Sequence, residues 1–217
     1  LNPRLPMMGI FATYSAGPDG TGLQARISAA YERDAANITR ENMLGSASQV
    51  SGKANVDSYG IAQRVGWGFR IGDGYVVTPY LGIRYTDAKR AGYEESYAAG
   101  AVNDPFSYAA YGMHRVTGTV GADLKGHLNN EITYRLGIGL DYDFSNNLDT
   151  FAARSALIGD MTYTNGLKAK SSRLFGSAGL GYALTPAGTL TLDGVIRQMD
   201  YGNNNAYTIL AGYRMAF

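Results

Sequence analysis

The sequence lacks cysteine altogether and has only two histidines and one tryptophan in 217 residues. Without cysteine there is no disulfide scaffold, thiolate metal site or cysteine nucleophile, and either redox compartment is tolerated. An excess of one charge is missing too, because 19 lysines and arginines stand against 18 aspartates and glutamates, for a formal net charge of +1. Such a chain has no broad basic field, so we expect no nucleic-acid partner.

Long apolar runs are also absent. No stretch approaches the roughly 18 uninterrupted apolar residues of a transmembrane helix, and the mean hydropathy is -0.17. A membrane β-barrel has a similar average, because each strand turns one face to lipid and the other to a polar lumen, so hydropathy alone does not decide the compartment. The residues before Met7, LNPRLP, lack the features of a signal peptide, so we expect any export signal to have been removed or to lie outside this chain.

The sequence is rich in glycine, with 29 residues, and in tyrosine, with 17. In EITYRLGIGLDYDF, aliphatic and aromatic residues occupy the even positions from Ile132 to Phe144, and Thr, Arg, Gly and Asp occupy the odd positions between them. The runs SYGIAQRVGWGFRI, YVVTPYLGIRYT and AYTILAGYRMAF alternate in the same way. Alternation with a period of two is typical of β-strands with two unlike faces, so we expect an all-β fold.

The polar faces of these runs combine Arg and Asp with glycine. A soluble β-sandwich would need an outer face rich in Lys, Glu and Thr with few glycines. In a barrel lumen, opposite charges can pair and small residues make room, while Tyr and Phe near the ends of the apolar faces are typical of the aromatic girdles of membrane barrels. The pattern favours a transmembrane antiparallel up-and-down β-barrel, with a soluble β-sandwich binding module as a less favoured alternative.

We expect the 217 residues to form one barrel domain with about eleven strands. Tight turns, namely GPDGTG, GDG, HLNN, GD and TPAG, are predicted on one rim, and the long loops after Asn37 and Glu95 on the other. Single-chain bacterial barrels have an even number of strands, so either the pair between Phe151 and Lys168 is miscounted or, as we favour, a first strand lies upstream of Leu1. The predicted strands are 7–17, 23–36, 55–71, 75–93, 113–127, 131–144, 150–158, 161–168, 172–184, 189–201 and 206–217.

A family resemblance emerges from the order of four segments. VDSYGIAQRVGWGFRIGDGYVVTPYLGIRYTDAKRAGYEES, VTGTVGADL, SSRLFGSAGLGYALTPAGTLTLDGVIRQMDYG and TILAGYRMAF follow one another as in the carboxy-terminal translocator domain of monomeric autotransporters, the type V secretion proteins, which the chain resembles. The resemblance implies a twelve-stranded barrel in the lipid of the Gram-negative outer membrane, with loops facing the cell surface. It also implies a lumenal linker helix leading to an amino-terminal passenger, which the barrel anchors and translocates. We identify neither the first strand, nor the linker helix, nor the passenger in these 217 residues.

The same resemblance gives a role to the last strand. In this family, a final strand that ends on an aromatic residue looks like the signal read by the outer-membrane barrel-assembly machinery. Gly212, Met215 and Phe217 occupy the positions of the glycine and the two hydrophobic residues of that signal. Leu210 departs from it, because a polar residue is common at that place.

Alternation also predicts which charged side chains face the lumen, where they either fill and hydrate the interior or contact a linker helix or translocating chain. We expect Glu94 and Glu95 to pair with arginines of this set. With arginine dominant, an open conduit would prefer anions. The predicted lumen-facing residues are Arg26, Arg64, Arg70, Arg84, Arg115, Asp123, Arg135, Asp141, Asp193, Arg197 and Arg214.

Motifs for bond chemistry are scarce. His114 and His127 lack a neighbouring pattern of metal ligands, so we expect them at solvated or rim positions. The segment GDGYV lacks the serine of a nucleophile turn and is typical of a hairpin. We therefore expect no catalytic, metal or cofactor-binding residues, and a small outer-membrane porin or channel remains the alternative function.

Overall fold

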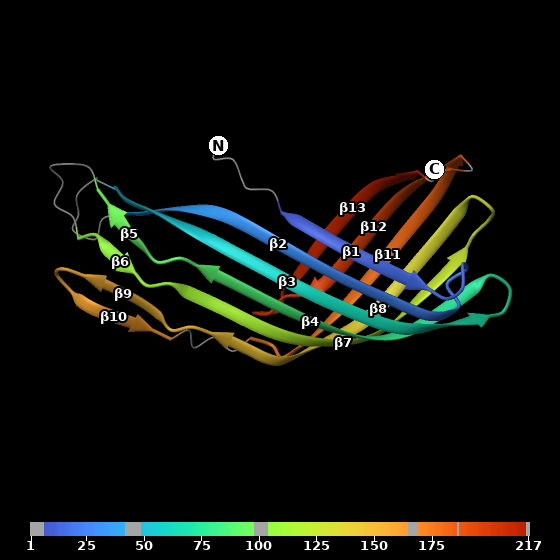
Figure 1. Ribbon diagram of the computed structural model, residues 1–217, viewed down its shortest axis with the longest axis horizontal. Coiled ribbons are helices and arrows are strands. Elements are labelled where there is room, and N and C mark those ends of the chain that lie inside the picture. The colour runs from blue at the N-terminus through green and yellow to red at the C-terminus, as the bar shows by residue number, and fades with distance from the viewer. Residues whose placement is uncertain (1–6, 42–48, 98–103, 165–168, 186, 216–217) are drawn as a thin grey trace.

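The computed structural model describes residues 7–41, 49–97, 104–164, 169–185 and 187–215, which form an antiparallel β-structure (Figure 1). Nine strands, each paired with the next in this order, make a sheet that we call the wall. They are β1 (Met8–Ser15), β2 (Gly22–Glu41), β3 (Gln49–Ile71), β4 (Tyr75–Arg90), β7 (Tyr111–His127), β8 (Ile132–Leu148), β11 (Ser172–Thr185), β12 (Gly188–Gln198) and β13 (Asn205–Met215).

Four short strands continue the sheet beyond one end of the wall. They are β5 (Tyr93–Ser96), β6 (Phe106–Tyr108), β9 (Phe151–Ser155) and β10 (Gly159–Tyr163), and they pair in the order β10, β9, β6, β5 before β5 joins β3. In Figure 1 they lie at the far left, past the ends of β4, β7 and β8. We call these four strands, with the outer ends of β2 and β3, the extension.

The two rims of the wall differ in the main as predicted. The connections 16–21, 72–74 and 128–131 and the connection between β11 and β12 lie on one side, the tight-turn rim, and none is longer than six residues. The other side, the loop rim, has the long connections 91–110 and 149–171, together with 199–204, which is no longer than 16–21. In the three-residue turn between β3 and β4, Gly72 and Gly74 have φ values of 60° and 100°, which only glycine adopts at little cost. The GD turn was wrongly assigned to the same rim, because Gly159 and Asp160 begin β10, directly after the turn 156–158 of the β9–β10 hairpin, which projects from the loop rim.

The expected eleven strands also need correction. The predicted strands 150–158 and 161–168 are the five-residue strands β9 and β10, too short for the roughly nine to eleven residues that a membrane-crossing strand requires. They belong to the extension and take no part in the wall, so the described wall has nine strands. Residues 165–168 of the second predicted strand lie outside the described residues.

Two strands are longer than the sequence predicted. The β2–β3 ladder continues from Gly22↔Gly68 as far as Glu41↔Gln49, although the predicted strands were 23–36 and 55–71. Beyond Tyr31 and Tyr59 the apolar residues lie on the opposite face of the hairpin, where Val50 and Ala54 are buried, and the backbone ladder continues. A single period of two does not continue through a reversal of the apolar face, so the predicted strands ended near that reversal.

The apolar side chains of the wall lie on its exposed face. In β8, the exposed fractions of Leu136, Ile138 and Phe144 are 48%, 65% and 68%, whereas Asp141 on the other face is 1% exposed. This reverses the usual arrangement in a soluble protein, in which large apolar side chains are mostly buried and charged side chains are mostly exposed. The faces predicted from alternation in β3, β4 and β8 agree with the structure.

Aromatic side chains border this apolar face at both rims. Toward the tight-turn rim lie Tyr14, Trp67, Phe69, Tyr75, Tyr182 and Tyr213, and toward the loop rim lie Tyr31, Tyr59, Phe144 and Tyr207. From Tyr59 to Phe69, β3 rises about 33 Å, which becomes roughly 25 Å of height at the tilt usual for a barrel. That height matches the apolar band of an outer-membrane barrel.

Glycines on the other face make room for large aromatic rings. A Cβ atom on Gly121 in β7 would lie 2.5 Å from the Tyr80 hydroxyl oxygen and 2.6 Å from the Ile138 carbonyl oxygen. Tyr80 is 5% exposed, and the Arg64 guanidinium lies 3.4 Å from the centre of its ring, so the ring has little freedom to move away. The glycine is therefore required by close packing.

Replacing Gly121 with alanine is expected to lower the free energy of unfolding by about 1–3 kcal/mol, because the new methyl group overpacks the Tyr80 ring and a backbone carbonyl. Gly60→Ala is the matched control, since its Cβ would lie 3.5 Å from the nearest atom, at ordinary contact distance. Urea unfolding of the full-length protein in detergent, followed by the shift of the unboiled band on a denaturing gel, measures both. Equal behaviour of the two variants would contradict the packing argument.

Candidate functional site: the polar face of the wall

The predicted lumen-facing residues lie on the wall face opposite the apolar band, which we call the polar face. Their faces follow from the register of the ladders, and most of them form ion pairs across strands. Asp123 pairs with Arg64, and Arg70 pairs with Asp19 in the first tight turn. The Arg135 Nη2 atom lies 2.6 Å from Asp193 Oδ1.

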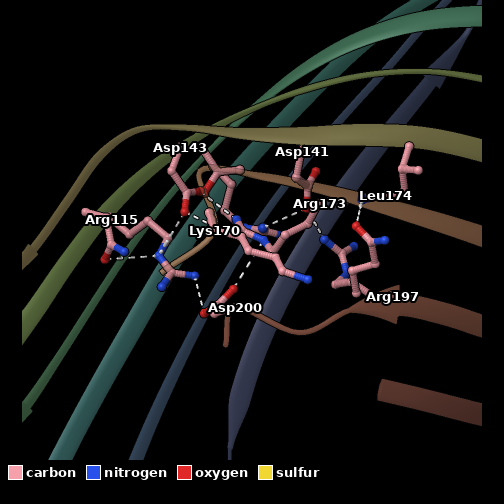
Figure 2. Close-up of polar contacts among 12 residues, drawn as sticks. Arg115, Asp141, Asp143, Lys170, Arg173, Leu174, Arg197 and Asp200 are labelled. Carbon is pink, nitrogen blue, oxygen red and sulfur yellow. Dashed lines mark hydrogen bonds and ion pairs between the residues drawn. The ribbon is translucent and has the colours of Figure 1, made fainter. Parts of the chain in front are cut away.

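The deepest feature of this face is a cluster of four ionised side chains, which we call the Arg173 cluster: Arg115, Asp143, Arg173 and Asp200 (Figure 2). Arg173 and Asp143 form a two-pronged pair, with both Nη···Oδ distances at 2.6 Å and both side chains no more than 3% exposed. The Arg173 Nε atom lies 3.2 Å from Asp200, and Arg115 Nη1 lies 2.7 Å from the same carboxylate. The cluster joins β7, β8 and β11 to the connection before β13.

Asp141 forms a second buried site beside this cluster. Its carboxylate is 1% exposed and pairs with two arginines that the sequence predicted on this face, Arg84 at 3.3 Å and Arg197. It also accepts a hydrogen bond from Thr119 Oγ1 at 2.6 Å. The Arg197 guanidinium lies 4.8 Å from the centre of the Phe175 ring, so this pair is both charge-matched and packed.

Sequence reasoning did not single out Arg173, Asp143 or Asp200. Two of them could have been found from the sequence. Asp143 lies on the predicted polar face of its strand, and Arg173 lies next to Leu174 near the start of β11, where neighbouring residues point to opposite faces. Asp200 lies in the connection between β12 and β13, where no period applies. Its contact with Arg115 joins residues 85 positions apart, which only the folded chain reveals.

The prediction that Glu95 pairs with an arginine of the wall set was wrong, because its partner is Arg40 in the extension. The Arg40 Nη2 atom lies 2.6 Å from Glu95 Oε2, and the Phe106 N–H donates to the same oxygen at 3.0 Å. Burial opposes ionisation of this carboxyl, but the hydrogen bonds from Arg40 and Phe106 hold the pKa of Glu95 below its ordinary value. Glu94 takes part in no ion pair among the described residues.

Tyr108 and Tyr93 pack beside the Glu95 carboxylate in the extension. Tyr108 donates to Glu95 Oε1 at 3.2 Å and stacks on Tyr93 with ring centres 4.6 Å apart. Burial and the adjacent Glu95 carboxylate raise the pKa of Tyr108 to about 12, so it keeps its donor proton at neutral pH. The extension thus has a small polar and aromatic core of its own outside the apolar band.

A cavity of about 530 Å³ lies on the polar face near the tight-turn rim, between β7, β8, β11, β12 and β13. We call it the rim basin, and its lining includes His127 and the charged side chains Lys125, Arg135, Asp193 and Arg214. Lys125 and Arg135 are direct partners in the β7–β8 ladder. His127 lies at the rim, as predicted, and His114 lies toward the loop rim, 2.7 Å from Asn147 Nδ2.

Metal-binding and helical membrane features are absent from the part of the chain that the structure describes. No three histidine, aspartate or glutamate side chains there are arranged to hold a metal ion. Within the same residues, no helix has the length and apolarity needed to cross a membrane.

Comparison with known proteins gives two positive findings. The profile of the family described as autotransporter beta-domain matches residues 7–195. Among solved structures, the chain is similar to the translocator domain of autotransporter NalP from Neisseria meningitidis, with a TM-score of 0.70 and 16% identity; the match covers 97% of this chain and 66% of that one. At this identity the likeness shows the fold, and no curated protein sequence matches the chain.

Proposed function

The chain belongs to the autotransporter β-domain family, and from that membership we propose that it is part of an outer-membrane β-barrel that anchors an amino-terminal passenger and translocates it to the cell surface. One observation on the molecule itself carries this proposal. The wall turns an apolar band with two aromatic borders outward and buries paired charges on its opposite face. Such an arrangement suits a sheet with lipid on one side and a polar lumen on the other.

We propose that the polar face lines the lumen. Its partners would then be the linker helix and passenger of the same protein, and the lipid of the outer membrane would cover the apolar band. The pairing of Arg64, Arg84, Arg135 and Arg197 with aspartates supports this assignment, because paired charges let a lumen remain polar without a large unbalanced field.

The directions of the two edge strands, β1 and β13, limit how the barrel can close. β1 and β13 both run toward the tight-turn rim, and among the described residues β1 pairs only with β2 and β13 only with β12. A direct junction of the two edges would be parallel, so antiparallel closure needs an odd number of further strands. Three more would give the twelve that the family resemblance implies, instead of the one expected from sequence. We propose that residues 1–217 form one translocator domain and that these strands and the passenger precede it.

Orientation and assembly complete the proposal. We assign the tight-turn rim to the periplasm and the loop rim, with the extension, to the cell surface. We also propose that the barrel-assembly machinery reads the end of β13, where Gly212 and Met215 lie. Phe217, the last residue of that signal, lies outside the described residues.

Labelling on intact cells tests this orientation sharply, because the 217 residues contain no cysteine. Leu157 in the β9–β10 turn and Leu128 in the β7–β8 turn are 70% and 67% exposed, so cysteines there form a matched pair. A membrane-impermeant maleimide should label Leu157→Cys and leave Leu128→Cys unlabelled until the outer membrane is opened. An antibody to the passenger should stain the same cells. Labelling of Leu128→Cys alone would show that the orientation is opposite to the one proposed. An unstained passenger would refute translocation.

A further inference from the structure

We propose that the rim basin is a binding site for carboxylate groups of an acidic polypeptide segment. The inference rests on the proposed function, since it concerns what passes along or occupies the polar face. It adds the chemical character of that polypeptide and the place where the wall holds it.

The first support is the uneven neutralisation of charge on the polar face. In the Arg173 cluster and around Asp141, carboxylates and guanidiniums satisfy one another, and Asp141, Asp143 and Arg173 are at most 3% exposed. In the rim basin, Lys125 and Arg214 are exposed and take part in no ion pair among the described residues. The basin's single aspartate, Asp193, is already paired with Arg135.

The second support is the close spacing of like charges. Lys125 and Arg135 face each other across the β7–β8 ladder, on the same face of the sheet. Like charges placed directly opposite each other on neighbouring strands destabilise a sheet unless an anion neutralises them. One aspartate cannot balance the two cations and the third at Arg214, so the basin has a net positive charge that an external carboxylate would offset.

The shape of the basin favours a segment of chain over a single small anion. Gly179, Gly181 and Gly212 line it without side chains that would fill it, which leaves about 530 Å³. Its cations come from β7, β8 and β13, and its lining residues span the five strands from β7 to β13, so the positive charges are contributed from both sides of the basin. Thr133, Thr189 and Thr191 add hydroxyl groups that can donate to or accept from a peptide backbone. A polypeptide bearing spaced carboxylates fits these features.

The test uses a cysteine at Thr191, which lines the basin, in the full-length protein purified in detergent. The rate at which a sulfonate-bearing methanethiosulfonate modifies this cysteine is measured alone and with hexaglutamate, hexalysine or inorganic phosphate. We expect hexaglutamate to slow modification at least fivefold at low salt, and hexalysine to have no effect. The cysteine could instead react slowly in the full-length protein before any peptide is added, and react faster once Lys125 and Arg214 are replaced. That result would show that the protein's own acidic segment fills the same site.

Two double variants show whether basin cations are responsible. Lys125→Gln with Arg214→Gln should abolish the protection, whereas Lys53→Gln with Arg154→Gln, which removes the same charge from the extension, should retain it. Protection by phosphate equal to that by hexaglutamate would overturn the polypeptide assignment in favour of a general anion site. Absence of any protection, or equal loss in both double variants, would overturn the site.

Surface labelling of Leu157→Cys and passenger staining in the same strains separate this inference from the proposed function. Normal staining with no protection at Thr191→Cys would refute the basin alone. Protection at Thr191→Cys with no passenger on the surface would refute the translocation proposal and leave the binding site standing.

Discussion

Replacing Arg173 with leucine is expected to lower the free energy of unfolding by about 3–5 kcal/mol, the loss typical of breaking a buried ion pair by removing one partner. The variant leaves Asp143, 3% exposed, without its two-pronged partner, and it also removes a guanidinium contact to Asp200. Urea unfolding of the full-length protein in detergent measures the loss, with the heat-modifiable band on an unboiled gel as the readout of the folded barrel.

Arg154→Leu is the control for this experiment. Arg154 pairs with Asp160 at 3.5 Å in the β9–β10 hairpin, but the two side chains are 78% and 82% exposed. An exposed pair contributes at most about 1 kcal/mol. If Arg154→Leu and Arg173→Leu shifted the unfolding midpoint equally, burial would not be what makes the Arg173 cluster important.

Placing arginine at Leu136 is expected to disfavour membrane insertion by up to about 2–4 kcal/mol, the cost of a cation on the lipid face at the middle of the bilayer, which falls toward either interface. Leu136 is 48% exposed and lies within the apolar band of β8. Folding of the full-length protein into lipid vesicles, scored by the heat-modifiable fraction across a urea series, gives the difference.

The neighbouring residue is a matched control on the other face. Arg135→Ala removes a charge whose side chain is 58% exposed and whose pair with Asp193 is open to solvent, so insertion should change little. Equal tolerance of Leu136→Arg and Arg135→Ala would contradict the assignment of the apolar face to lipid.

Alternation predicted the two faces well wherever lipid and lumen impose different demands on one strand. In β8 it placed Leu136 and Ile138 on one face and Arg135 and Asp141 on the other, as found. It failed beyond Tyr31 and Tyr59, because the apolar residues there move to the other face of the hairpin, where Val50 and Ala54 are buried, so the alternation reverses its phase while the backbone ladder continues. The opposite error occurred at β9 and β10, which were predicted as membrane strands although they are five-residue strands of an outlying hairpin.

Which charges meet could not be predicted from alternation alone. The sequence placed Arg84, Asp141 and Arg197 on one face, but it could not show that a single aspartate holds both arginines from β4 and β12. Those contacts depend on curvature of the sheet and on side-chain reach across intervening strands. Glu95 illustrates the same limit, since its partner Arg40 lies 55 residues away in a segment expected to be a loop.

The up-and-down order of the wall also bears on how quickly the chain folds. Each wall strand pairs with the next wall strand along the chain, and the hairpins of the tight-turn rim close short loops at little entropic cost, whereas the β4–β7 and β8–β11 pairs span the long connections 91–110 and 149–171. The extension and the Arg173 cluster differ, because β6 pairs with β9 some way along the chain and Arg115 reaches Asp200 over 85 positions. We therefore expect the hairpins to form first and the buried charges to come together last, locking a sheet that is already in register.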